Sequence, residues 1–432
     1  MAPRFRAGKS WTATLLITIV ATFAVFAVGC GDDDDDKGGG GGDDSASSGE
    51  TVKVGNITSV AGIGGVFAGY QAGVKAFFDY YNSQGGIDGT KVELITVDDA
   101  ADPGKATAGA RKLVSQDKVL AIVGQASLAD AATAKYFNAQ GIPVVGGWAT
   151  SSAWHNPNTN MFVNIEGPNL PYCGLWPLDF AAEYGGIESI AFIAQDFPTA
   201  TQDADCRAAA AKRSGLGVSG KRIDVALTAA DYRPAMQQAI ATGADAIFYS
   251  TGSDGQLKGI QAGEQLGFEG TYITTQPSGL EEPLAPLKLD DRVLTGAFSL
   301  LPSDPDSIND ELAAFKKGME QFQPKYATEI TAVSGWAAGR MFADALKAAG
   351  ADQQGIIDYL AEQKEYTFGG LQGPMDYTDG SKPNPCTTRL VMQGGRWVRA
   401  EEAAEPPEFD CGPLIDPKTD EINGAEQYAS DE

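Results

Sequence analysis

The sequence predicts an α/β fold with two doubly wound parallel sheets, each covered by helices on both faces. Short apolar runs alternate with stretches of helical period between residues 52 and 147. A second alternating series of the same kind follows between residues 189 and 275. The chain has 432 residues, which is more than one ordinary hydrophobic core accommodates. Two α/β domains are therefore expected.

The first series sets the arrangement of the first domain. We expect strands at 52–57, 92–97, 119–123 and 143–146, and helices at 69–83, 104–115 and 128–137. Parallel strands joined by helices have all their carboxyl ends at one edge of the sheet, where open α/β sheets bind ligands. The loops that open on this rim are 58–67, 98–102, 124–127 and 147–152.

The second series follows the same alternating pattern. Its expected strands are 189–194, 222–227, 246–250 and 271–275, and its expected helices are 172–184, 200–214, 232–241 and 255–266. Three further helices should pack back on the first domain, because no strands separate them: 309–322, 332–349 and 354–362. Gly394-Gly395 joins two short strands, 389–393 and 396–399, as a hairpin.

The charge balance excludes two classes of partner. The formal net charge is −25, from 32 basic and 57 acidic residues. Nucleic-acid phosphates require a basic surface, so nucleic acid is not an expected partner. Direct adsorption to anionic lipid is disfavoured for the same reason.

The N-terminus indicates export. Three basic residues precede an apolar run from 11 to 29, which ends in small residues just before Cys30. The small-residue tetrapeptide ending in Cys30 resembles a bacterial lipobox, which implies cleavage of a signal peptide (1–29) and a lipid on Cys30. A permanent anchor helix is the alternative, because the run is nearly long enough to span a membrane. Residues 30–50 are rich in Asp and Gly and should form a disordered tether.

The remaining cysteines agree with export. An even number of cysteines in an exported chain suggests two disulfides, and three pairings are possible. We prefer Cys173–Cys206 and Cys386–Cys411, each closing a loop of about 30 residues and contributing roughly 3–4 kcal/mol. Free or metal-bound thiols are the alternative, but no pair has CxxC spacing and His155 stands near none of them. We expect no metal and no cofactor.

Two motifs carry a resemblance to a known family. NSQGGIDG at 82–89 and VELITVDDAADPGKATAGARKLVSQDKVLAIVGQ at 92–125 resemble the type I periplasmic binding proteins of the branched-chain amino acid (Leu/Ile/Val) transporter class. The resemblance implies two lobes joined by a three-strand hinge, which close on a small solute and deliver it to an ABC permease. The expected division is 51–165 with 300–367 as lobe 1, 166–299 with 368–400 as lobe 2, and 401–432 as an acidic, mostly disordered tail pinned in part through Cys411.

The resemblance also suggests ligand contacts in lobe 1. A zwitterionic amino acid needs donors for its carboxylate and acceptors for its ammonium, and helix N-termini offer backbone donors. Ser127 stands before the third expected helix, and Thr150 follows the fourth expected strand. Matching positions in the family hold the carboxylate and the ammonium, which implies ligand contacts for Ser127 and Thr150 and, beside them, Ala149 and Ser151. The alternative for each is a helix-cap or turn role.

The sequence departs from the family pattern in lobe 2. A Tyr-Gly pair covers the ligand in the family, whereas this chain has Phe197 as the aromatic residue of that segment. The acidic partner of the ammonium would be Asp254, but a shift of two residues would bring Gln256 instead. The solute is therefore not fixed as leucine, isoleucine or valine, and amides, urea-like compounds and aromatic acids stay open.

Two further features of lobe 1 are ambiguous. Trp148 stands where the family usually has a small residue, so it either faces the ligand or packs against Trp154 or the hinge. The acidic residues Asp98, Asp99 and Asp102 are expected to form a solvated loop and a helix cap.

Enzymatic functions are disfavoured. His155 is the one histidine, and no GxSxG elbow surrounds Ser127. The glycines at 62, 64, 65 and 69 do not make GxGxxG, because Phe67 stands where the third glycine is needed, and no GxxxxGK[ST] motif occurs. The expected function is that of a lipid-anchored, extracytoplasmic and monomeric solute-binding protein that serves an ABC permease. A ligand sensor of the same fold that signals to a partner protein is the alternative, because fold alone does not separate the two.

Overall fold

The computed structural model describes residues 50–423 except 62–64, 66, 156–159, 167–172, 177, 185, 379–385, 401–408, 412–413 and 416–421. The expected signal peptide, the tether and Cys30 lie outside the described residues. Among the described helices, none combines the length and the apolar character that crossing a bilayer requires.

Lobe 1 is built on a five-stranded parallel sheet in the order β2-β1-β3-β4-β5. Its strands are β1 (Thr51–Thr58), β2 (Lys91–Asp98), β3 (Ala121–Ala126), β4 (Val144–Trp148) and β5 (Met161–Phe162). The crossover helices are α1 (Ala68–Ser83), α2 (Pro103–Ser115) and α3 (Ala131–Gln140). Strand β3 is buried along its whole length, as expected for a central strand with helices on both faces. The alternating series predicted for 52–147 is confirmed.

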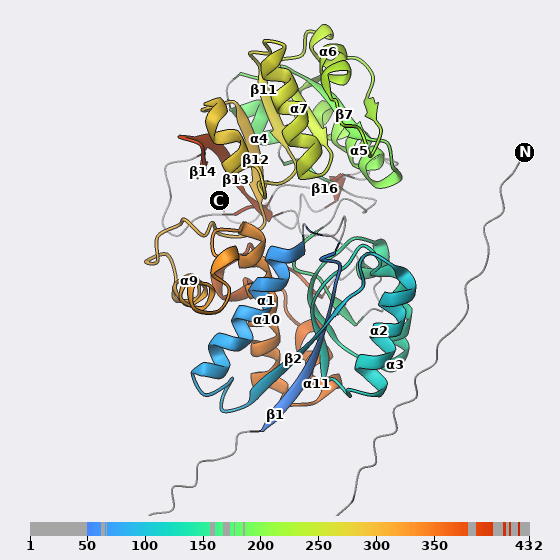
Figure 1. Ribbon diagram of the computed structural model, residues 1–432, viewed down its shortest axis with the longest axis vertical. Helices are drawn as coiled ribbons and strands as arrows, with labels where there is room; N and C mark the ends of the chain where they lie inside the picture. Colours follow the sequence, from blue (N-terminus) through green and yellow to red (C-terminus); the bar gives the residue numbers. More distant parts are fainter. Residues whose placement is uncertain are drawn as a thin grey trace, which may run out of the picture. The chain divides into compact units, whose positions relative to one another are not determined.

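Three C-terminal helices complete lobe 1: α9 (Asp310–Phe322), α10 (Ile330–Ala349) and α11 (Gln353–Ala361). Helices α1 and α10 lie on one face of the sheet and α2 and α3 on the other (Figure 1). The ring of Trp336 in α10 lies edge-on to Phe77 in α1, with centroids 5.2 Å apart. Helices α1 and α10 approach closely, since a Cβ on Gly335 would lie 1.9 Å from the carbonyl oxygen of Tyr70. The prediction that these helices return to the first domain is confirmed.

Lobe 2 is built on a second, mixed sheet in the order β14-β13-β12-β11-β10-β7-β8, with β9 also paired to β7. The parallel strands are β7 (Ser189–Gln195), β8 (Gly217–Val218), β9 (Ile223–Val225), β10 (Ala246–Ser250), β11 (Thr271–Thr274) and β12 (Val293–Ala297). Its helices are α4 (Leu178–Glu183), α5 (Pro198–Arg213), α6 (Arg233–Ala241), α7 (Ser253–Gln265) and α8 (Glu281–Leu284).

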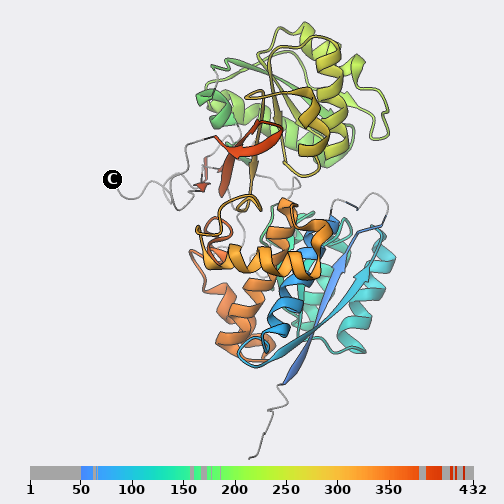
Figure 2. The same ribbon diagram turned by 60° about the vertical axis from the view of Figure 1, so that its left-hand side comes forward.

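An antiparallel hairpin extends the sheet of lobe 2. Strands β13 (Cys386–Gln393) and β14 (Arg396–Arg399) pair in the register Met392 opposite Trp397. Gly394 and Gly395 both have positive φ angles, of 58° and 74°, which a tight hairpin turn requires. Figure 2 shows this hairpin in red at the edge of the lobe. The predicted hairpin is confirmed.

The chain passes between the lobes three times, after β5, after β12 and before β13. Side-chain hydrogen bonds and a backbone β-bridge tie the three crossings together. Asn164 of the first crossing donates from Nδ2 to Oε1 of Gln372 in the third (3.0 Å), and Gln372 donates back from Nε2 to the Asn164 carbonyl oxygen (3.0 Å). Ser299 of the second crossing forms a β-bridge with Gln372. Asn164 and Gln372 are both buried, so this exchange of hydrogen bonds is shielded from water.

The expected helix at 172–184 is partly wrong, whereas the expected attachment of the tail through Cys411 is confirmed. Within 172–184, Cys173–Gly174 form strand β6, and a helix, α4, begins at Leu178. Strand β6 exists because β16 (Leu414–Ile415) pairs with it, and β17 (Ile422–Asn423) pairs with β16 in turn. Strand β15 (Asp410–Cys411) pairs with β13. The described tail residues are thus held on lobe 2 at two places.

Both disulfides flank these tail contacts. Cys173 of β6 pairs with Cys206 of α5 over a sequence separation of 33 residues. Cys386 of β13 pairs with Cys411 of β15 over a separation of 25 residues. The preferred pairing is confirmed, and each disulfide fixes a strand against which the tail lies.

Candidate functional site

The rim of lobe 1 is organised around the buried carboxylate of Asp99, directly after β2. Its Oδ1 accepts hydrogen bonds from Ser59 Oγ (2.5 Å) and from the backbone N–H of Ala101 (2.9 Å). Its Oδ2 accepts a hydrogen bond from Ser127 Oγ. Ser59, Asp99 and Ser127 are fully buried. The carboxylate therefore joins the ends of β1, β2 and β3 on the rim where α/β sheets bind ligands.

Ser127 has its hydroxyl committed inside this network. The hydroxyl donates to Asp99 and accepts from the backbone N–H of Ala129 at 2.9 Å. This is the turn role given above as the alternative. Helix α3 begins at Ala131, three residues after the predicted start. The structure places Ser127 on the predicted rim, and its contact with a ligand stays a prediction.

The three neighbouring aspartates have different roles. Asp102 caps α2 by accepting from the backbone N–H of Lys105 at 2.8 Å, as predicted. Asp98 is exposed and accepts from the backbone N–H groups of Val60 (3.1 Å) and Ala100 (2.9 Å). The prediction of a solvated loop residue is wrong for Asp99, because its oxygens are satisfied by hydroxyl and backbone donors rather than by water.

Asp130 holds the segment that follows β4. Its Oδ2 accepts from the backbone N–H of Thr150 (2.8 Å) and from Nε1 of Trp154 (2.8 Å). The Thr150 hydroxyl donates to the carbonyl oxygen of Ser127 at 2.7 Å. Thr150 is half-buried, so this fixed hydroxyl keeps part of its surface on the rim. Two hydrogen bonds to the segment that follows β3 thus set where Thr150 lies.

The neighbours of Thr150 differ in their accessibility. Ala149 is buried, and its backbone N–H donates to the carbonyl oxygen of Ile165 at 2.9 Å. Ser151 is half-buried, and its Oγ is a buried atom without a hydrogen-bond partner among the described residues. A buried hydroxyl without a partner is energetically costly, which makes Ser151 a candidate to bond an incoming polar group.

Aromatic surface lies beside these polar groups. Trp148 is half-buried, and its ring lies edge-on to Phe67 with centroids 5.1 Å apart. Trp148 does not stack on Trp154. Trp154 instead fills the space under Gly147, where a Cβ would lie 2.2 Å from the indole ring. Leu128, next to Ser127, exposes 46% of its surface. The lobe 1 rim therefore offers both polar atoms and an apolar surface.

Phe197 lies on the rim of lobe 2, two residues after the end of β7 and directly before the first residue of α5. It is half-buried, and the backbone around it is held by Gln195, whose Oε1 accepts from the N–H of Gly252 at 3.1 Å. Leu227, which follows β9, exposes 57% of its surface. An aromatic and an aliphatic side chain are thus available on this rim.

Asp254 and Gln256 lie in the first turn of α7 and differ in burial. The Asp254 side chain is 78% exposed, and Lys258 Nζ lies 2.5 Å from its carboxylate. Gln256 is fully buried and donates from Nε2 to the carbonyl oxygen of Thr251 (2.7 Å) and to Thr275 Oγ1 (2.8 Å). Neither arrangement presents a buried acid to a solute, so a ligand contact of Asp254 stays a prediction.

Four residues that organise the site were not predicted as such: Asp99, Asp130, Asn164 and Gln372. Each lies just after a strand end or in a crossing between the lobes, in segments that the predicted topology places on the rim or at the hinge. Their common signal is a polar residue directly after an apolar run, which is also the signal of an ordinary loop.

Comparisons with known proteins show which family this chain matches. A family model described as "Periplasmic binding protein" matches residues 51–393. A Pseudomonas aeruginosa protein described as "Amino acid binding protein" is 44% identical over 55 residues, which are 13% of this chain and 15% of that protein. The match thus spans only a small part of the length of that relative.

Solved structures match the fold over most of the chain. A substrate-binding periplasmic protein from Ralstonia solanacearum aligns with a TM-score of 0.68 and 18% identity, over 81% of this chain and 100% of the other. A solute-binding protein from R. palustris in complex with 4-hydroxybenzoate has a TM-score of 0.68 and 18% identity, over 84% and 98%. A branched-chain amino acid ABC transporter protein from Thermus thermophilus with bound valine has a TM-score of 0.68 and 13% identity, over 84% and 97%. These identities establish the shared fold.

Proposed function

We propose, since the chain belongs to the type I periplasmic binding proteins of the branched-chain amino acid ABC class, that it captures an amino acid or amino-acid-like solute between its lobes. It delivers this solute to an ABC import permease. The periplasmic binding protein family is one of solute binders rather than of enzymes.

The observation that carries the proposal is the composition of the lobe 1 rim. Thr150 is fixed by Asp130 and Ser127, Ser151 has an unpartnered buried hydroxyl, and Trp148 presents a half-buried ring beside them. A polar group on such a solute would bond the hydroxyls, and its apolar body would lie on the ring. Sites of this kind are mostly apolar, with a few placed polar groups that orient the ligand.

The crossings between the lobes support capture by closure. Hinge closure concentrates the backbone change in a few connecting residues while the lobes move as units. The hydrogen bonds between Asn164 and Gln372 join the first and third crossings side by side. The β-bridge between Ser299 and Gln372 joins the second crossing to the third. Rotation of one lobe about this tied point would bring Phe197 toward Thr150 and exclude water from the solute.

A thermal-shift screen tests the solute class. Amino acids, amides, ureas and aromatic acids are added in turn to the purified chain. The aromatic acids are included because proteins of this fold bind valine in one case and 4-hydroxybenzoate in another. A solute at 100 times its dissociation constant should add about 2.7 kcal/mol to the free energy of unfolding. A shift with aromatic acids alone would contradict the amino-acid assignment, and no shift with any class would contradict solute binding.

Membrane attachment through Cys30 is the second part of the proposal. Mass spectrometry of the membrane fraction should find a chain that begins at Cys30 and carries a lipid, because the lipobox-like tetrapeptide directs cleavage before that residue. Two or more acyl chains hold a protein at a membrane stably, at about 0.8 kcal/mol per buried methylene. An intact Met1 terminus in that fraction would instead favour the permanent anchor helix. A Cys30→Ala variant is the matched control, and it should be recovered without a lipid.

A further inference from the structure

We propose that Asp130 is the residue that makes this site select solutes with a cationic nitrogen. The inference rests on the proposed function, because it assigns the charge preference of the same rim. The two oxygens of this buried carboxylate differ in their hydrogen bonding.

Asp130 is a buried acid with half of its carboxylate unsatisfied. The residue exposes 1% of its surface. Oδ2 accepts hydrogen bonds from the Thr150 backbone and the Trp154 indole, whereas Oδ1 is buried without a partner among the described residues. No lysine or arginine of the described chain forms an ion pair with it. A buried carboxylate without a counter-charge or a full set of donors is unfavourable, so a ligand that supplies them gains affinity.

The other buried acids of the described chain show what Asp130 lacks. Asp99 has donors on both oxygens, from two hydroxyls and a backbone N–H. Asp203 is bonded by Arg207 and Ser250, and Asp304 by Arg399 and the backbone N–H of Leu301. Glu311 is bonded by Arg340, Trp336 and Tyr81. Asp130 is the exception among these buried acids.

Asp130, whose Oδ1 has no partner among the described residues, is bonded directly to a residue of the rim. Its satisfied oxygen binds the backbone of Thr150, and the next residue, Ser151, has the other unpartnered buried side-chain oxygen of this segment. A cationic nitrogen held at Thr150 and Ser151 would lie near an uncompensated negative charge. In a poorly hydrated surrounding, that attraction is much stronger than in water.

Lobe 2 does not offer an equivalent charge in its described residues at the predicted place. The Asp254 carboxylate is 78% exposed and paired with Lys258. Solvent and the lysine both screen it, so it contributes little selectivity. The negative charge that would attract a cationic group of the solute therefore comes from Asp130 in lobe 1.

Two variants separate the charge of Asp130 from its structural role. In Asp130→Asn, the single amide oxygen can still accept from Thr150 and Trp154, but the negative charge is gone. In Trp154→Phe, one hydrogen bond to Oδ2 is lost while the charge stays. Asp254→Asn tests the competing acid of lobe 2, at an exposed position where the fold is not at risk.

The experiment is titration calorimetry of the full chain with two matched pairs of probes. L-leucine is compared with 4-methylpentanoate, and L-phenylalanine with 3-phenylpropanoate, which lack only the amino group. We expect the unmodified protein to prefer at least one amino acid over its partner by tenfold or more. Asp130→Asn should reduce this preference at least tenfold, whereas Trp154→Phe and Asp254→Asn should leave the ratio unchanged, even where Trp154→Phe weakens both members of a pair.

Other results overturn the inference. An unchanged ratio in Asp130→Asn, a loss of the ratio in Asp254→Asn, or an unmodified protein that binds neither amino acid would each contradict it. If Asp130→Asn does not fold, an unchanged ratio in both Asp254→Asn and Trp154→Phe supports the assignment, and a changed ratio in either opposes it. Failure of the proposed function is a separate result, in which no solute of the thermal-shift screen binds.

Discussion

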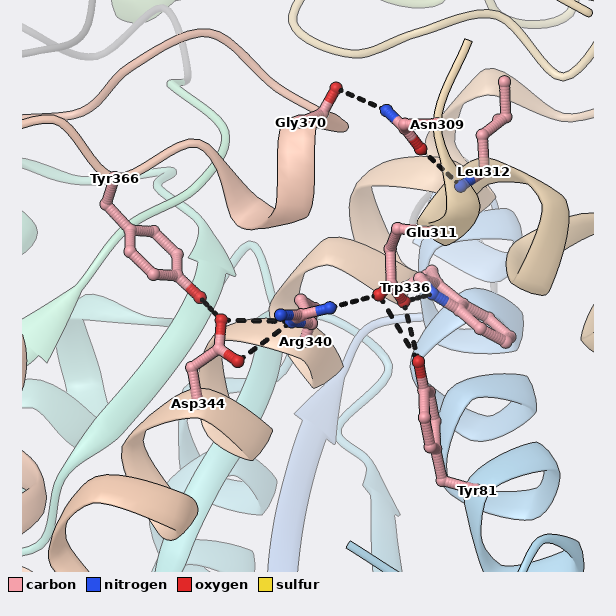
Figure 3. A network of polar contacts seen from close by, with 9 residues as sticks. All are labelled: Tyr81, Asn309, Glu311, Leu312, Trp336, Arg340, Asp344, Tyr366 and Gly370. Carbon is pink, nitrogen blue, oxygen red and sulfur yellow. Dashed lines mark hydrogen bonds and ion pairs between the residues drawn. The ribbon is translucent and has the colours of Figure 1, made fainter. Parts of the chain in front are cut away.

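Replacing Arg340 by Met is expected to lower the free energy of unfolding by about 3 kcal/mol, because the variant leaves a buried carboxylate without its cation. Arg340 Nη1 pairs with Glu311, and Nε lies 2.9 Å from Asp344 (Figure 3). The Glu311 side chain is only 5% exposed. Without Arg340 it keeps neutral donors, Trp336 Nε1 at 2.6 Å and Tyr81 Oη at 3.2 Å, which do not compensate its charge.

The measurement is urea unfolding of the variant beside two controls. Lys75→Met removes an exposed pair with Asp79 four residues along α1, and this should cost less than about 0.5 kcal/mol. Adding Glu311→Gln to the Arg340 variant should recover part of the loss, since it removes the uncompensated charge. A double variant no more stable than Arg340→Met would show that the loss comes from packing rather than from charge.

The same network reaches the segment that leads to the third crossing. Tyr366 donates its hydroxyl to Asp344 at 2.7 Å, and Asn309 donates from Nδ2 to the carbonyl oxygen of Gly370 at 3.1 Å (Figure 3). Burial, together with the nearby charge of Asp344, raises the pKa of Tyr366, so the phenol remains a neutral donor at physiological pH. The network thus anchors the lobe 1 end of the hinge to α9 and α10.

The regular elements were predictable because their apolar period is local. Strand β10 (Ala246–Ser250) has the predicted bounds, and α10 begins two residues before its predicted start. Strand β6 was not predictable in this way. It is a strand only because Cys173 and Gly174 pair with Leu414 and Ile415, far away in the sequence. A pairing that a distant segment provides leaves no periodic signal in either partner.

The sequence predicted where in the fold the site lies better than it predicted which residues form it. The rim followed from the topology, and it contains Trp148, Thr150 and Ser151 in lobe 1 and Phe197 in lobe 2. Burial decides the role of each carboxylate, and the local sequence does not show burial directly. Asp99 is buried and accepts hydrogen bonds from Ser59 and Ser127, whereas Asp98 beside it is exposed.

Variants on the two rims are expected to weaken solute binding. Thr150→Ala removes a half-buried hydroxyl from lobe 1, and Phe197→Ala removes a half-buried ring from lobe 2. Each should raise the dissociation constant about tenfold or more, which corresponds to about 1.4 kcal/mol. Thr150→Ala also loses the hydrogen bond to the Ser127 carbonyl oxygen, and this should cost about 1 kcal/mol of stability.

Thr107→Ala is the matched control for Thr150→Ala. Thr107 lies in α2, and its hydroxyl donates to the carbonyl oxygen of Pro103 at 2.8 Å, so the variant loses the same kind of bond. Because Thr107 is not among the expected ligand contacts, solute affinity should not change.

Titration calorimetry of these rim variants, with the solute that gives the largest thermal shift, tests capture between two lobes most directly. We expect both Thr150→Ala and Phe197→Ala to weaken binding at least tenfold, while Thr107→Ala binds like the unmodified protein. A solute held by one lobe alone would leave the affinity unchanged in Thr150→Ala or in Phe197→Ala, and that result would contradict capture between the lobes.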